Sequence, residues 1–95
     1  MKVVVEINRP ANPTGQSFIK TFYAQLKANG VEMSKELNRA IARLGYRIEE
    51  ETGIGKFITG KFEVDLEGRK IKILELQVWE PKPAMLPANK LVIEY

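Results

Sequence analysis

The sequence predicts an α+β fold, a mostly antiparallel sheet of about five strands with a helical pair packed on one face. Three observations predict it. Two stretches place apolar residues at helical spacing, several short segments alternate apolar and polar residues, and two of those segments match as a hairpin. The expected order is β-α-α-β-β-β-β, within a single domain that spans all 95 residues.

The chain opens with a strand and a long helix. Residues 2–8 alternate around Val3, Val5 and Ile7 and predict a strand that is largely buried. The turn-forming residues at 8–15 predict a loop. Apolar residues then recur every three or four positions over 16–29, which is the pattern of an amphipathic helix.

A second helix is expected over residues 35–44, with Ser34 as its N-cap. Gly45 stands where a helix commonly ends, in the position that favours a left-handed backbone. After it, Tyr46 and Ile48 alternate with charged residues, so a short strand is expected up to Glu51.

The next two strands form the best-defined pair. Residues 58–66 share one apolar face, and Glu67-Gly68 follows as the centre of a hairpin turn. Folding there puts opposite charges together on one face and apolar side chains together on the other. The expected pairs are Asp65 with Lys70, Val64 with Ile71, Glu63 with Lys72 and Phe62 with Ile73.

The pattern changes beyond the hairpin. The apolar alternation slips by one residue at Ile73-Leu74, which indicates a β-bulge or a strand buried on both faces. The proline-rich residues 80–89 are expected to form an extended connection outside the sheet. Residues 91–95 predict the closing strand.

Composition excludes several kinds of chemistry. The chain has no cysteine and no histidine, so disulfides, thiolate nucleophiles, imidazole bases and the commonest metal ligands are absent. The opening apolar run is too short for a signal peptide or a membrane span, and we expect a cytoplasmic protein that does not contact membranes. The Lys- and Glu-rich composition is typical of a thermophile.

Two motifs suggest chemistry that their surroundings do not support. Residues 55–61 have the GxxxxGK spacing of a phosphate-binding loop, but Phe62 replaces the required Ser/Thr and a strand follows instead of a helix. Glu49 and Glu51 would share one face of a strand, where a solvated edge explains them as well as acid–base chemistry does. We predict no catalytic residue, no cofactor and no metal site.

Net charge is +3, and the positive excess lies in the first half of the chain. Residues 1–47 carry eight basic and three acidic side chains. On the second helix the cations recur every fourth residue, on the side opposite its apolar face. This row would contact either a nucleic acid or only solvent. The row consists of Lys35, Arg39 and Arg43, with Arg47 just beyond the helix.

The proline-rich segment is the other candidate contact surface. It combines rigid prolines with two apolar side chains near Trp79, a composition suited either to a protein partner or to packing over the sheet. The residues that would make the contact are Pro83, Met85, Leu86 and Pro87.

These observations predict a non-enzymatic protein-interaction module that uses the proline-rich segment or a sheet edge, with a protein partner or a second copy. The alternative is weak, sequence-tolerant nucleic-acid binding through the basic helix face.

Three segments carry a resemblance to a known group of proteins. They are the opening Val3-Val4-Val5-Glu6-Ile7, the stretch from Leu44 to Glu51 and the exit Trp79-Glu80-Pro81. With them, the whole chain resembles a family of small proteins of unknown function from hyperthermophilic archaea. The resemblance supports the α+β fold, and it implies no activity, cofactor, partner or functional residue.

Overall fold

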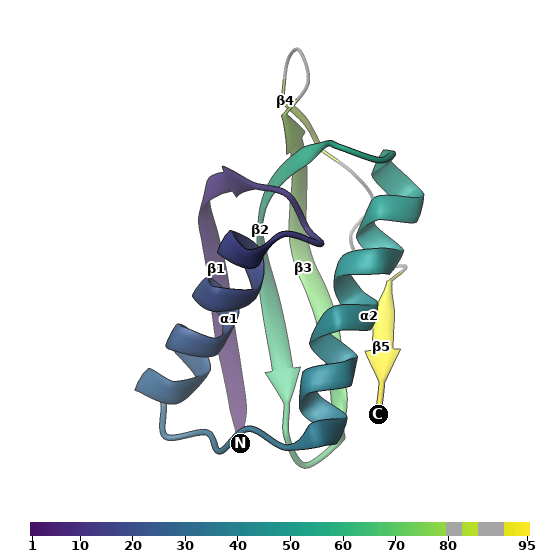
Figure 1. The fold of residues 1–95 in the computed structure, drawn as a ribbon. Helices are drawn as coiled ribbons and strands as arrows, with labels where there is room; N and C mark the ends of the chain where they lie inside the picture. The colour runs from purple at the N-terminus through teal and green to yellow at the C-terminus, as the bar shows by residue number, and fades with distance from the viewer. Residues whose placement is uncertain (80–82, 86–90) are drawn as a thin grey trace.

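Two helices cover one face of an antiparallel sheet in a computed structural model that describes residues 1–79, 83–85 and 91–95 (Figure 1). Helix α1 lies over the β1 side of the sheet, and α2 lies over β3 and β5. The α+β class and the strand-helix-helix order at the start of the chain are therefore confirmed. The elements are β1 (Lys2–Ala11), α1 (Gln16–Ala28), α2 (Lys35–Thr52), β2 (Phe57–Asp65), β3 (Lys70–Trp79), β4 (Pro83–Met85) and β5 (Val92–Glu94).

The sheet is four strands wide. Its first three positions are β1, β2 and β3, each antiparallel to the next. The fourth position is shared by two short strands, because β4 pairs with the end of β3 and β5 pairs with its beginning. β1 also runs farther than expected, to Ala11, with a break in register after Ile7.

Helix α2 corrects the prediction for residues 35–51. We expected a helix over 35–44 and then a strand, but α2 continues through Gly45 to Thr52. Gly45 does not end the helix. It lets α2 approach the loop before α1, where a Cβ on Gly45 would lie 2.2 Å from the carbonyl oxygen of Pro13. The helix ends instead at Gly53, whose φ of 105° few other residues adopt.

The β2–β3 hairpin has the predicted register. All four expected pairs are present, from Asp65 with Lys70 to Phe62 with Ile73. The β-bulge is present too, because Phe62 pairs with Ile73 while Lys61 pairs with Glu75, which leaves Leu74 as the extra residue. Asp65 stabilises the turn by accepting a hydrogen bond from the Gly68 N–H at 2.9 Å.

The core lies between the helices and the sheet and contains apolar side chains only, within the part of the chain that the structure describes. Three phenylalanines join α1 to β2, with ring centroids of Phe18, Phe22 and Phe62 between 5.5 and 5.8 Å apart. From α2, Ile41, Leu44 and Ile48 complete the core. This helical spacing continues through Gly45, which is why the segment remains helical.

The proline-rich segment also needs a correction. We expected residues 80–89 to lie outside the sheet, but Pro83–Met85 form β4 and pair with Gln77–Trp79. Because β4 lies at the edge, Pro83 removes no hydrogen bond from the sheet interior. Leu86 and Pro87, the other two predicted contact residues, lie outside the described residues.

Candidate functional site

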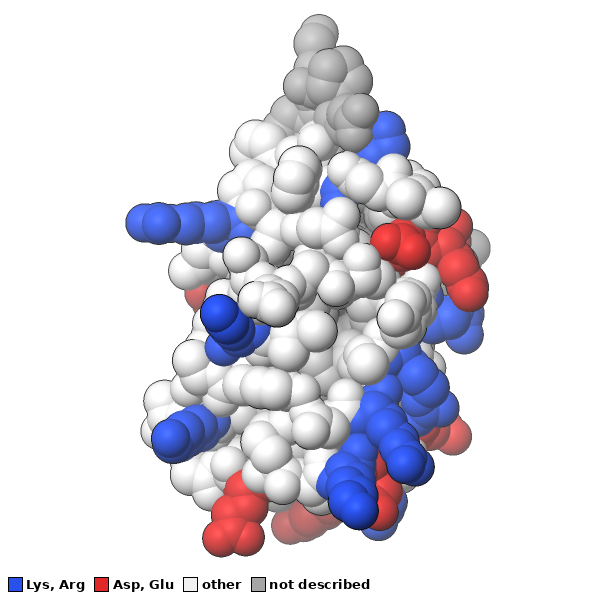
Figure 2. All heavy atoms as spheres, in the orientation of Figure 1, with Lys and Arg blue, Asp and Glu red and all other residues white. Residues whose placement is uncertain are grey.

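The four predicted cations form one row on α2. Because α2 continues to Thr52, Arg47 belongs to the helix and does not lie beyond it as expected. Lys35, Arg39, Arg43 and Arg47 are all exposed, and we call this row the basic face. It extends about 18 Å along the helix and turns about 120° around it, at ~1.5 Å and ~100° per residue. Figure 2 shows basic side chains gathered over the first turns of α2.

Three of these cations have no ion-pair partner among the described residues, namely Lys35, Arg39 and Arg43. Arg47 lies 3.5 Å from the Glu50 carboxylate, an exposed pair that contributes little to stability. The guanidinium of Arg43 donates a 2.7 Å hydrogen bond to the Glu94 carbonyl oxygen and so joins α2 to β5. The basic face therefore keeps most of its positive charge.

The charges on α2 oppose its dipole. Lys35 is the first helical residue, where negative charge is favoured, and only Glu36 supplies it there. Glu49, Glu50 and Glu51 lie near the C-terminus, where positive charge is favoured. The Ser34 hydroxyl accepts a hydrogen bond from the Leu37 N–H and caps the helix start without adding charge. The helix dipole therefore does not explain the positive charge of Lys35.

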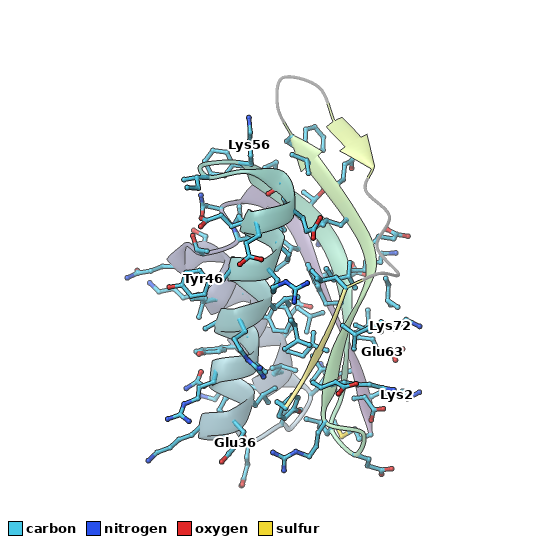
Figure 3. All side chains as sticks on the ribbon, turned by 90° about the vertical axis from the view of Figure 1, so that its right-hand side faces the viewer. Lys2, Glu36, Tyr46, Lys56, Glu63 and Lys72 are labelled. Atoms are coloured by element: carbon cyan, nitrogen blue, oxygen red, sulfur yellow. The ribbon has the colours of Figure 1, made fainter. Side chains whose placement is uncertain are left out.

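A groove of about 530 Å³ runs along the basic face. Its lining consists of Glu36, Arg39, Ala42, Arg43, Tyr46 and Tyr95. The Tyr46 side chain is 61% exposed and points away from the sheet (Figure 3). The prediction missed this groove because it placed Tyr46 in a strand. The recurrence of Arg39, Ala42 and Tyr46 at helical spacing was the available signal.

Tyr95 is held in place by Arg69. The Tyr95 N–H donates to the Arg69 carbonyl oxygen at 2.8 Å, and Arg69 Nε donates to the Tyr95 carbonyl oxygen at 2.7 Å. The Arg69 guanidinium also lies 5.4 Å from the centre of the tyrosine ring. Burial raises the pKa of the Tyr95 phenol, and the charge of Arg69 partly opposes this. The ring therefore forms a fixed, neutral wall of the groove.

The face of the sheet away from the helices balances its own charge. Its side chains form cross-strand rows of alternating sign, and Figure 3 shows Lys2, Glu63 and Lys72 on this side. Lys2 lies 3.9 Å from Glu63, and Lys61 lies 4.0 Å from Glu6. The rows are Lys2, Asp65, Lys70 and Glu94; Val4, Glu63, Lys72 and Val92; and Glu6, Lys61 and Glu75.

Side chains and short strands cover parts of the sheet edges. At the β1 edge, the Gln25 carboxamide donates to the Glu6 carbonyl oxygen at 2.6 Å and accepts from the Glu6 N–H at 2.8 Å. Farther along, Asn8–Pro10 interrupt the register. On the opposite side, β4 and β5 cover both ends of β3. Protein contact through an edge or through Pro83, Met85, Leu86 and Pro87 remains a prediction.

The fold accounts for both motifs that suggested chemistry. Residues 57–61 of this motif are the first part of β2, as the apolar alternation predicts, and no helix follows them within the described residues. Glu49 and Glu51 lie on a helix and not on a strand, so they point to different sides, and Glu49 accepts a 3.1 Å hydrogen bond from the Thr14 hydroxyl. The described residues contain no group of three or more His, Cys, Asp or Glu side chains that would hold a metal ion.

Comparison of the chain with models of known protein families, with curated proteins and with solved structures gives no match. The resemblance to an archaeal family therefore remains a hypothesis. Neither α1 nor α2 is long and apolar enough to cross a membrane.

Proposed function

We propose that this protein binds nucleic acid through the basic face of α2, mainly by contacts with phosphates and with little dependence on base sequence. The observation that carries the proposal is the uneven charge of the two layers. The lysines of the sheet face lie opposite acidic residues on neighbouring strands, whereas on the basic face only Arg47 has an ion-pair partner among the residues described here.

The geometry of the basic face suits a polyanion. Four cations along about 18 Å of helix meet several phosphates at once, and each contact releases bound counterions. Arg39 and Arg43 add the planar guanidinium that binds phosphate oxygens in pairs. The Glu49–Glu51 carboxylates repel phosphate at the C-terminal end of α2, so the expected path ends before them.

The test compares two charge-matched variants. In the first, Lys35, Arg39 and Arg47 become Gln; Arg43 is kept because it joins α2 to β5. In the control, Lys61, Lys70 and Lys72 on the sheet face become Gln. Fluorescence anisotropy with labelled DNA and RNA measures the affinity of each.

The first variant should bind about 10- to 100-fold more weakly, as expected for three exposed charge contacts of up to ~1 kcal/mol each. The control should lose less than about 3-fold, since it changes the net charge equally but leaves the basic face intact. Equal losses in both variants would contradict the proposal, because they would indicate a general effect of net charge.

A further inference from the structure

We infer that the ligand is a single strand of nucleic acid, and that one of its bases stacks in the groove between α2 and β5. This inference rests on the proposed function and adds the class of nucleic acid and the contact that selects it. It starts from an observation that charge alone does not explain: Arg39 and Arg43 line the groove together with two tyrosine rings and an alanine.

The groove has the parts needed to hold one planar ring. Tyr46 presents an exposed aromatic surface, and Tyr95 supplies a second ring whose backbone and side chain Arg69 holds in place. Ala42, one turn before Tyr46 on α2, also lines the groove, and its side chain is small. Bases stack on such rings with little regard to their identity, because every base has an aromatic face.

The phosphates have partners next to the rings. Arg39 and Arg43 line the same groove as Tyr46, so a strand with a base stacked on Tyr46 brings its phosphates to the guanidinium groups. Glu36, which also lines the groove, repels phosphate and favours a path along the two arginines.

A duplex does not offer these contacts. Its bases are stacked on one another, and a side chain on a helix surface does not reach their faces without unstacking them. A duplex would still meet the basic face through its phosphates. Single strands should therefore bind more tightly than duplexes, and the difference should depend on Tyr46.

The experiment measures binding of a labelled ten-nucleotide strand and of the same strand annealed to its complement (a length of about one site on such a surface). Tyr46→Ala should weaken single-strand binding about 5- to 100-fold, the effect of losing one stacked base, and change duplex binding less than about 2-fold. Tyr46→Phe should bind like wild type. Ala42→Leu, which fills the groove and keeps both rings, should also weaken single-strand binding.

Phe57→Ala is the matched control, because Phe57 is another exposed aromatic residue, at the start of β2, and does not line the groove. Circular dichroism checks that each variant is folded. The inference is overturned if Tyr46→Ala leaves single-strand affinity unchanged, if the duplex binds as tightly as the single strand, or if Phe57→Ala loses as much affinity. It is also overturned if a free mononucleotide competes as well as the strand, or if wild type forms a dimer that Tyr46→Ala separates.

The proposed function and the stacking inference can fail independently of each other. If removal of the basic face weakens binding but Tyr46→Ala does not, the basic face binds nucleic acid and only the stacking inference is wrong. If wild type binds neither the strand nor the duplex, the proposed function itself is wrong.

Discussion

Gly45 shows how one residue sets the path of α2. A glycine inside a helix costs about 1 kcal/mol relative to alanine, so Gly45→Ala would stabilise an isolated helix. Here the added Cβ would lie 2.2 Å from the Pro13 carbonyl oxygen, which is backbone and does not rotate away. Overpacking of this kind costs about 1–3 kcal/mol or more, and it outweighs the gain in helix propensity.

We therefore expect Gly45→Ala to lower the free energy of unfolding by about 1–2 kcal/mol, measured by urea or thermal denaturation. An unchanged or higher stability would show that the loop before α1 moves away freely. In that case the packing of α2 against this loop would not require a glycine at position 45.

Asp65 makes the stability of the hairpin turn depend on pH. The hydrogen bond from the Gly68 N–H lowers the pKa of Asp65 from its ordinary 3.8, and Lys2 and Lys70 add to the effect. A lowered pKa in the folded state means that its stabilisation is present above pH 3.8 and is lost as the pH falls below that value.

Asp65→Asn keeps an oxygen that accepts the hydrogen bond but does not titrate. Its melting temperature should fall less than that of wild type between neutral pH and about pH 2.5. If both proteins lose the same stability on acidification, the turn carboxylate does not contribute to the acid sensitivity of the fold.

At the scale of the elements, β1 is protected by a side chain from α1. The Gln25 carboxamide bonds both backbone groups of Glu6, as a neighbouring strand would. Without it, β1 presents those groups to any chain that adds a strand. This contact covers the β1 edge at Glu6, so we favour a binding site on the helix layer over one at this edge.

Gln25→Ala should lower the free energy of unfolding by about 1–2 kcal/mol, for two hydrogen bonds of roughly 0.5–1.5 kcal/mol each. It should also raise the average mass in sedimentation at high protein concentration. Lys27→Ala, on the same helix but without such a contact, is the control. A variant that sediments and unfolds like wild type would show that Gln25 does not protect the edge.

The elements differ in how far the sequence predicts them. The hairpin register follows from local pattern, because a shift by one residue would bury Glu63 and expose Phe62. The end of α2 does not follow from local pattern. Gly45 resembles a helix terminator, and the residue it packs against, Pro13, is distant in sequence. The groove depends on the pairing of β5 with β3, which brings Tyr95 to α2, and no local signal encodes that.

At the scale of the whole molecule, the two layers carry charge in different ways. The sheet face alternates charge across its strands and neutralises itself, whereas the basic face of α2 keeps most of its charge and lies beside two tyrosines. Both layers share one apolar core. The proposed function explains this difference in charge between the two layers.

The most direct test is the salt dependence of binding to a labelled single strand between about 50 and 200 mM salt. The log–log slope should be about −2 to −3 for wild type, from ~0.7 per phosphate and three or four contacts. It should shrink to about −1 when Lys35, Arg39 and Arg47 become Gln. No binding at the lowest salt, or the same slope in both proteins, would contradict nucleic-acid binding by the basic face.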